Sequence, residues 1–232
     1  MARLTRLAVA GQAHLVLLRG HGGQPVFGDD LDRAAFVSAL EAACDQEKVA
    51  LHAFALLPSL VWLLATPAQA QGVGRAIQVL GRRFSAGVNR RYRRSGSVWD
   101  GRYRSAIVEP GAELLKAMVF VEQAPVRSGM SLDAVSAEWS SARQHSGLKS
   151  EYSLTDCEAY WLLGNTPFDR CAAYRTLLDE PQPRAYAEKL AGAVMRGWPI
   201  GSQAFVEGLR QHTSRPLVPR PRGRPRKPSV AI

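Results

Sequence analysis

The chain has 232 residues, of which 46% are hydrophobic, 22% charged and 8% aromatic. These proportions are typical of a globular protein and exclude wholesale disorder, a collagen or a coiled coil. The three cysteines form no Cys-x-x-Cys pair, which excludes a zinc knuckle or a disulfide framework and favours a reducing compartment. The net charge of +10 favours a polyanionic partner, above all nucleic acid, over a face that is charged only for solubility.

No segment has the ~20 consecutive apolar residues that a membrane helix needs. The densest apolar stretch, residues 53–65, is 13 residues long and is broken by Pro58 and Ser59. The basic amino terminus is followed by an apolar stretch that Gln12 and His14 interrupt, which does not fit a signal peptide. We therefore expect a cytoplasmic protein with no membrane partner, and its expected affinity for nucleic acid would place it at the nucleoid.

Apolar periodicity predicts the elements of the first half of the chain. Short apolar runs bounded by turn residues are typical of strands, and apolar residues recurring every three or four positions are typical of amphipathic helices. Asp29 and Asp30 suit the start of the first helix, and Pro125 ends the third because its ring blocks continuation. In chain order we predict strand 13–18, helix 30–48, strands 50–57 and 60–66, helix 71–92, strand 105–108 and helix 111–123.

This order favours an α+β fold of the ferredoxin-like kind, in which an antiparallel sheet carries helices on one face. After about residue 150 the pattern becomes helical. Thr166, Pro167 and Asp169 form a helix-start signal, and Ser202 caps a last helix over 203–212. We predict a DNA-binding domain over residues 1–150, a small helical region over 151–214 and a basic tail over 215–232.

The tail carries a charge of +6, and its prolines and lack of an apolar pattern predict a segment that is disordered alone. Within it, Arg222, Gly223, Arg224 and Pro225 match the core of an AT-hook. An extended Arg-Gly-Arg unit fits the narrow minor groove of A·T tracts, where the negative potential is enhanced. The alternative is a tail that contacts phosphates without reading the bases.

A second basic segment, residues 82–104, carries +7 and interleaves arginines with aromatic residues. Single-stranded nucleic acid needs this combination, because cations contact its phosphates and rings stack on its unpaired bases. Phe84 lies on the apolar stripe of helix 71–92 and is expected in the core. Arginines 90, 91, 93 and 94 cannot all face one side of a helix, so some are simply solvated. The candidate DNA-binding residues here are Arg82, Arg83, Arg90, Arg91, Arg93, Arg94, Trp99, Arg102, Tyr103 and Arg104.

Seven short motifs occur in a recognisable order along the chain. They are Arg19-Gly20, Gln24–Phe27, Leu57–Leu64, Gly81–Phe84, Trp99–Ser105, Pro125–Gly129 and Trp139–Ser141. In this order they resemble the REP-associated tyrosine transposases, a branch of the single-tyrosine HUH transposases. The resemblance spans roughly residues 3–147, is similar further on through Arg196-Gly197-Trp198, and includes the basic tail.

The resemblance implies a ferredoxin-like domain that binds folded single-stranded DNA hairpins. In that family two strand histidines hold a divalent metal, and a helix tyrosine attacks the scissile phosphate. In this sequence those positions are Leu60, Trp62 and Phe120. Leucine and indole offer no lone pair to a hard metal, and a phenyl ring has no oxygen for the covalent bond. We therefore expect a metal-free and cofactor-free former active site, with no catalytic residues.

Two other functions remain open. The first is a working transposase with unorthodox residues, in which Tyr92 or Tyr103 supplies the nucleophile. The second is a protein–protein adaptor whose partner surface is the cluster of Leu60, Trp62 and Phe120. The favoured function is a DNA-binding protein that acts as a regulator or as the DNA-binding subunit of a larger assembly. Its partners would be single-stranded or hairpin DNA, an A·T-rich duplex through the tail, and a second copy of the chain or other proteins.

Overall fold

The computed structural model describes residues 5–219, and its first half is a four-stranded antiparallel sheet with the order β2-β3-β1-β4. This is the strand order of a ferredoxin-like fold, as the sequence predicted. The elements that build it are β1 (Ala13–Arg19), α1 (Asp30–Gln46), β2 (Val49–Leu56), β3 (Leu60–Pro67), α2 (Gly72–Arg91) and β4 (Arg104–Val108). A short 3-10 turn, η1 (His21–Gly23), follows β1. All of the predicted elements up to residue 108 are present, with ends shifted by one or two residues.

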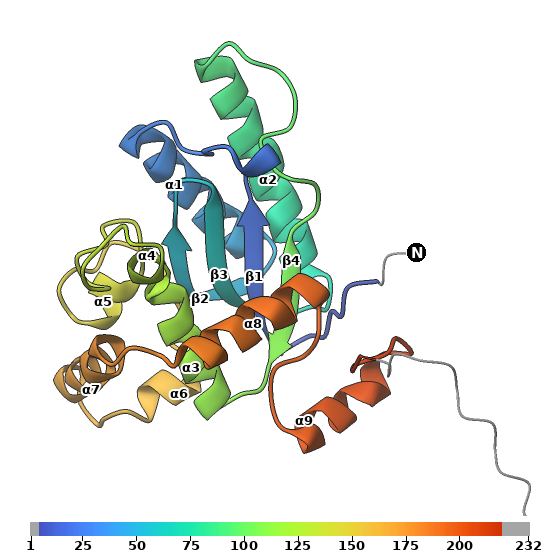
Figure 1. Ribbon diagram of the computed structural model, residues 1–232, viewed down its shortest axis with the longest axis vertical. Coiled ribbons are helices and arrows are strands. Elements are labelled where there is room, and N and C mark those ends of the chain that lie inside the picture. Colours follow the sequence, from blue (N-terminus) through green and yellow to red (C-terminus); the bar gives the residue numbers. More distant parts are fainter. Residues whose placement is uncertain (1–4, 220–232) are drawn as a thin grey trace, which may run out of the picture.

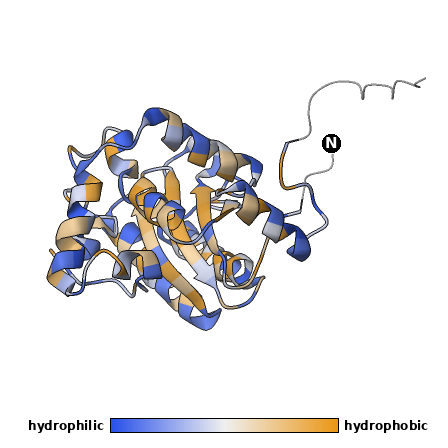
Figure 2. Cartoon of the chain, turned by 90° about the horizontal axis from the view of Figure 1, so that it is seen from below, coloured by the Kyte–Doolittle hydropathy of each residue, from blue (hydrophilic) through white to orange (hydrophobic). Residues whose placement is uncertain are grey.

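The sheet has helices on both of its faces (Figure 1). On one face, α1 and α2 cover Val16 and Leu18 of β1. On the other face, Leu15 and Leu17 pack in a second core with α3 (Ala112–Glu122) and α8 (Arg184–Arg196). Figure 2 shows the apolar strands between these helical layers. The predicted fold had helices on one face, and the second layer comes from the chain that follows β4.

The chain turns sharply after α3. Pro125 lies in the first turn of a separate short helix, α4 (Ala124–Arg127), where its missing N–H needs no partner. Later short helices are α5 (Ala142–His145) and α6 (Glu158–Trp161). The predicted stop near Gln123 is therefore a break between two helices.

The predicted caps of the longer helices are present. The Asp29 carboxylate accepts a hydrogen bond from the Asp32 N–H at 3.1 Å at the start of α1. Thr166 and Asp169 form a capping box at the start of α7 (Pro167–Asp179). Ser202 accepts from the Phe205 N–H at the start of α9 (Gln203–Gly208), which continues into the 3-10 turn η2 (Leu209–His212). Side-chain oxygens at these positions satisfy N–H groups that the first helical turn leaves unpaired.

The carboxyl-terminal helices are joined to the sheet by hydrogen bonds as well as by packing. Ile200 extends the sheet beside β4, where its N–H donates to the Ile107 carbonyl and its carbonyl accepts from the Glu109 N–H, both at 2.8 Å. A buried carboxylate, Glu122 of α3, accepts hydrogen bonds from Ser141, His145 and Tyr174. These contacts attach α5 and α7 to α3.

The predicted tail starts later than residue 215. Leu217 is buried with Leu7 and Ile107, and Arg215 donates to the Thr5 carbonyl at 2.7 Å and to the Gly197 carbonyl. One apolar side chain and one guanidinium thus attach residues 215–219 to the body. The AT-hook match at 222–225 lies outside the described residues. Within residues 5–219, no helix combines the length and the apolar content that crossing a bilayer needs.

Candidate functional site

The segment between residues 99 and 104 leaves the edge of the sheet and forms one wall of a cavity. Regular pairing of β1 with β4 ends at Leu17 and Arg104, and an isolated bridge joins Gly20 to Trp99. The chain between these two points bows outward. Gly101 has a φ of +63°, a left-handed conformation that a residue with a side chain adopts at a cost.

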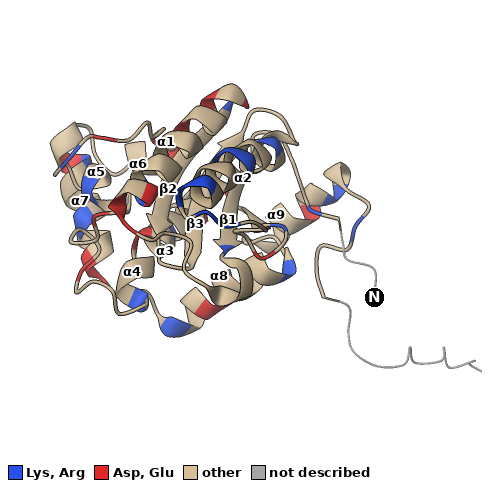
Figure 3. Ribbon diagram, turned by 90° about the horizontal axis from the view of Figure 1, so that it is seen from above, with Lys and Arg blue, Asp and Glu red and all other residues tan. Residues whose placement is uncertain are grey.

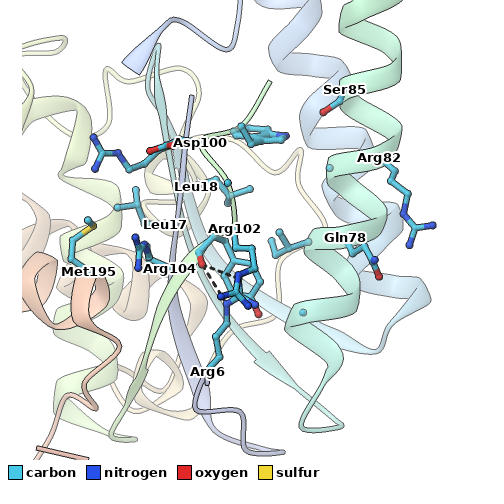
Figure 4. A pocket seen from close by; sticks show the side chains of 17 residues that line it. Arg6, Leu17, Leu18, Gln78, Arg82, Ser85, Asp100, Arg102, Arg104 and Met195 are labelled. Atoms are coloured by element: carbon cyan, nitrogen blue, oxygen red, sulfur yellow. Dashed lines mark hydrogen bonds between the residues drawn. The ribbon is translucent and has the colours of Figure 1, made fainter. Parts of the chain in front are cut away.

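The cavity has a volume of about 630 Å³ and lies between this segment and α2 (Figure 4). Helix α2 contributes Gly74, Ile77, Gln78 and Gly81, while Met195 of α8 lies at the opposite end. Cavities of this size, 300–1,000 Å³, commonly hold a small ligand or one group of a larger one.

Two smaller cavities of about 150 and 250 Å³ continue the first, sharing Arg6 and Tyr103 with it. We call the three together the arginine groove. Asp100 is the one acidic residue among those that line it, all of them in the described part of the chain. The arginines that line the groove are Arg6, Arg19, Arg75, Arg82, Arg102, Arg104, Arg196 and Arg215.

Arg6 holds the outward segment in place. Its guanidinium lies over the Tyr103 ring at 3.9 Å from the centroid and donates to the Tyr103 carbonyl at 3.2 and 3.3 Å. Burial raises the pKa of the Tyr103 hydroxyl. One face of the Tyr103 ring is therefore covered by a cation.

The structure divides the ten predicted residues of segment 82–104 into two groups. Five line the groove, namely Arg82, Trp99, Arg102, Tyr103 and Arg104, and the other five do not. Blue bands along α2 in Figure 3 mark arginines of both groups.

Arg91 belongs to the second group and is bound within the protein. It forms ion pairs with Asp29 and, at 2.5 Å, with Asp32. The hydrogen bonds from Arg91 lower the pKa of Asp29 to about 2. Arg83 donates to Gln46 at 3.2 Å, and Arg90, Arg93 and Arg94 are exposed beyond the groove.

Sequence reasoning missed the groove arginines outside the two basic segments. Arg6 and Arg19 flank the first strand, Arg75 begins α2, and Arg196 ends α8. None lies in a dense basic segment, so local charge density gives no sign of them, although the motifs of the resemblance include Arg19 and Arg196. Arg215 lies inside the predicted tail but lines the body of the protein.

The three positions at which the resemblance expects metal ligands and a nucleophile lie together. The rings of Trp62 and Phe120 meet edge to face with centroids 5.0 Å apart, and their exposed fractions are 7% and 2%. Leu60 packs against the same core, and the Arg127 guanidinium lies 4.0 Å from the Phe120 ring centroid. This cluster, Leu60–Trp62–Phe120, is the apolar centre.

The apolar centre does not fit a divalent metal, because neither Leu60 nor Trp62 offers a lone pair. Within residues 5–219, no group of three or more His, Cys, Asp and Glu side chains could hold a metal ion. His52, the histidine nearest in sequence to Leu60, is bound elsewhere: its Nδ1 lies 2.7 Å from the Thr155 carbonyl and its Nε2 lies 2.8 Å from the Thr66 hydroxyl.

Tyr92 and Tyr103 are the two alternative candidates for the nucleophile. The Tyr92 hydroxyl donates to Asp32 at 2.8 Å, and this hydrogen bond raises its pKa. The pKa of Tyr103 is raised as well, by burial. A raised pKa keeps the hydroxyl protonated at neutral pH, which disfavours the phenolate that attacks phosphorus.

No family model matches the sequence, and comparison with curated proteins finds no match. Among solved structures, a REP-associated tyrosine transposase bound to a REP hairpin aligns with a TM-score of 0.55 and 12% identity, over 68% of this chain and 96% of that one. This chain has the fold of that transposase. The resemblance read from the sequence motifs is thus confirmed at the level of the fold.

A candidate transposase from Deinococcus radiodurans R1 aligns less closely, with a TM-score of 0.35 and 19% identity. That alignment covers 47% of this chain and 88% of the other.

Proposed function

We propose that this chain binds DNA in its arginine groove, prefers single-stranded or hairpin DNA, and does not cleave it. The observation that carries the proposal is the charge of the groove, in which eight arginines and one acid line three continuous cavities. Phosphates are the natural partner of such a surface, because guanidinium groups bind them as pairs of hydrogen bonds and release their counterions.

The groove supports an unpaired strand better than a plain duplex. Trp99 and Tyr103 lie among its arginines, and the main cavity, at about 630 Å³, is large enough for a group that leaves the strand. Duplex bases are stacked and cannot enter such a cavity without unpairing. The transposase of similar fold is bound to a hairpin, which agrees with this preference.

The apolar centre supports binding without chemistry. Cleavage by this family's route needs two metal ligands and a phenolic oxygen, and Leu60, Trp62 and Phe120 supply none of them. An enzyme acting through Tyr92 or Tyr103 would have to ionise a hydroxyl whose pKa is raised. An adaptor surface at the apolar centre would need exposed rings, whereas Trp62 and Phe120 are buried.

A protein of this kind would serve as a regulator or as the DNA-binding subunit of a larger assembly, located at the nucleoid. The AT-hook match at residues 222–225 would add affinity for A·T-rich duplex, and a dimer would place two grooves on neighbouring DNA sites. These roles extend the proposal and are tested apart from it.

The test measures affinity by fluorescence anisotropy for a hairpin with a single-stranded tail, the same strand without a stem, and a blunt duplex. The groove variant is Arg82→Gln with Arg102→Gln. If both residues contact phosphates, the slope of log affinity against log salt becomes shallower by about 1.4 units, at ~0.7 per contact on single strands. The matched control is Arg90→Gln with Arg94→Gln, which removes the same charge from outside the groove.

If the slope of log affinity against log salt became equally shallow in both double variants, the contribution of the arginines to binding would not depend on their position in the groove. Tightest binding to blunt duplex would contradict the preference for unpaired DNA. Incubation of the labelled hairpin with Mg²⁺ or Mn²⁺ tests for cleavage, and we expect neither shorter DNA nor a covalent protein–DNA adduct. Either product would revive the enzyme hypothesis.

A further inference from the structure

Trp99 lines the main cavity and carries a hydrogen-bond donor that has no partner among the described residues. Its ring packs on Phe36 and Phe84, with centroids 5.9 Å away in each case, so the indole is fixed from the core side. Its Nε1 is buried and has no hydrogen-bond partner among the described residues. A buried donor without a partner is unfavourable, and an acceptor on a ligand would recover the missing hydrogen bond.

The α2 wall of the cavity includes two glycines. Gly74 and Gly81 both line the cavity and lie seven residues apart, which places them on one face of the helix. A Cβ added to Gly81 would come 4.0 Å from the Trp99 Nε1, and one added to Gly74 would come 3.4 Å from the Tyr103 hydroxyl. Glycine inside a helix is unfavourable relative to alanine, so the open space is obtained at the expense of helix stability.

Polar groups surround this space at the positions that a nucleotide would use. The Gln78 amide and the Ser85 hydroxyl line the cavity from α2 and can pair with the edge of a base. Arg82 of α2 and Arg102 of the outward segment also line the cavity and are available to phosphates of the same strand. An apolar floor of Leu18 and Ile77 suits the face of a ring.

We propose that the main cavity takes one unpaired base of the bound DNA strand, with the Trp99 indole N–H donating to a carbonyl oxygen or ring nitrogen of that base. This inference rests on the proposed function and adds to it a specific contact. It distinguishes the main cavity, which holds a base, from the rest of the arginine groove, which holds backbone phosphates.

The experiment is an abasic scan of a hairpin with a six-nucleotide single-stranded tail, in which the stem fixes the register. Each tail position in turn loses its base while the phosphate charge is kept. We expect one position at which the loss lowers the affinity of the natural protein roughly tenfold, as expected for one base contact, while the other positions have small effects.

Two glycine variants make the scan specific to the cavity. Gly81→Leu fills the cavity from α2, and Gly87→Leu adds the same side chain to the same helix where a Cβ meets nothing within 4 Å and does not face the groove. With Gly81→Leu we expect the intact hairpin to bind about tenfold more weakly and the sensitive abasic position to cause no further loss. Gly87→Leu should retain the natural pattern.

The Trp99 N–H gives a second readout that does not depend on the leucine variant. In protein labelled with ¹⁵N at the indoles, the signal that Trp99→Phe removes should shift when the intact hairpin is added and stay in place with the sensitive abasic hairpin. If Gly81→Leu does not fold, Gly81→Ala replaces it, because the added Cβ makes only an ordinary contact with the Trp99 Nε1 at 4.0 Å. This smaller substitution should weaken the shift of the Trp99 signal.

The outcomes separate the two proposals. If the natural protein binds neither hairpin nor single strand, the proposed function fails. If it binds both but every abasic hairpin binds equally and Gly81→Leu behaves as Gly87→Leu, the base cavity is wrong and the groove holds phosphates alone.

Discussion

The apolar centre and the arginine groove lie on neighbouring strands, yet they have opposite chemical character. Trp62 is paired with Leu17 in the sheet, and Leu17 is paired in turn with Arg104, so one row of three residues leads from a buried ring to the groove. The apolar centre is closed by ring packing, whereas the groove is open and charged. The contrast teaches that one fold can place a sealed apolar core and an open, arginine-lined surface on neighbouring strands.

The largest expected effect is a loss of stability caused by a substitution in the apolar centre alone. Phe120→Ala removes a ring that is 2% exposed and leaves a cavity beside Trp62, so the free energy of unfolding should fall by about 3–5 kcal/mol. The affinity of the folded variant for the hairpin should stay within about twofold, because the groove residues are untouched. Chemical denaturation and anisotropy measure the two quantities.

The control uses the same substitution at Phe168, which is 86% exposed. Its effect on stability should be within about 0.5 kcal/mol. A loss of similar size at both positions would mean that Phe120 is not packed as described. A large loss of affinity in folded Phe120→Ala would place the apolar centre within the DNA site.

Lowering the pH should destabilise the fold through a buried histidine, His14, on the groove side of the sheet. His14 lies beside the groove, and burial lowers its pKa to about 4, against the opposing effect of a hydrogen bond with the Val9 backbone. The native state therefore resists protonation, and stability is lost as the pH falls from about 6.5 toward 4. Between pH 7 and pH 5 this loss amounts to about 2 kcal/mol. Between pH 7 and pH 5, the free energy of unfolding of His14→Gln should fall by about 2 kcal/mol less than that of the natural protein. An equal loss in both proteins would mean that other groups cause the acid sensitivity.

Raising the pH should destabilise the opposite side of the sheet. Burial disfavours a charged His145, but the Glu122 carboxylate 2.6 Å from its Nδ1 outweighs burial and raises its pKa. Asp156, 3.9 Å from Nε2, acts in the same direction. Stability from this pair is complete below the unfolded pKa of about 6.5 and is lost as the pH rises through the folded value.

The free energy of unfolding cannot change by more than about 1.4 kcal/mol per pH unit through the titration of one group such as His145. Thermal unfolding of the natural protein and of His145→Gln between pH 6 and pH 9 measures it. A steeper decline in the natural protein is the expected result. Parallel curves would show that His145 is neutral in the folded state.

The sequence was sufficient for the parts of the fold that depend on local chemistry. Caps such as Thr166 and Ser202, and the order of strands and helices along the chain, follow from residue type and apolar period. The groove could not be predicted in full, because Arg19 and Arg196 reach it from distant parts of the chain. The ion pairs of Arg91 could not be predicted for the same reason, since Asp29 and Asp32 approach it only in the folded protein.

The smallest expected effect concerns the tail, and the fold decides which control is valid. Arg215 binds the Thr5 and Gly197 carbonyls, so its removal would disturb the body as well as the charge. The proper comparison is Arg222→Ala with Arg224→Ala against Arg220→Ala with Arg226→Ala, because each pair removes two charges from residues 220–232. If the tail reads the minor groove, the first pair should lower the preference for A·T-rich over G·C-rich duplex roughly threefold, or ~0.7 kcal/mol. The second pair should leave that preference unchanged. In both double variants, the affinity for the hairpin should fall less than the affinity for duplex at the same salt concentration, because the arginine groove remains. Equal loss of preference in the two pairs would make the tail a general counter-charge, since phosphate contacts carry no sequence information.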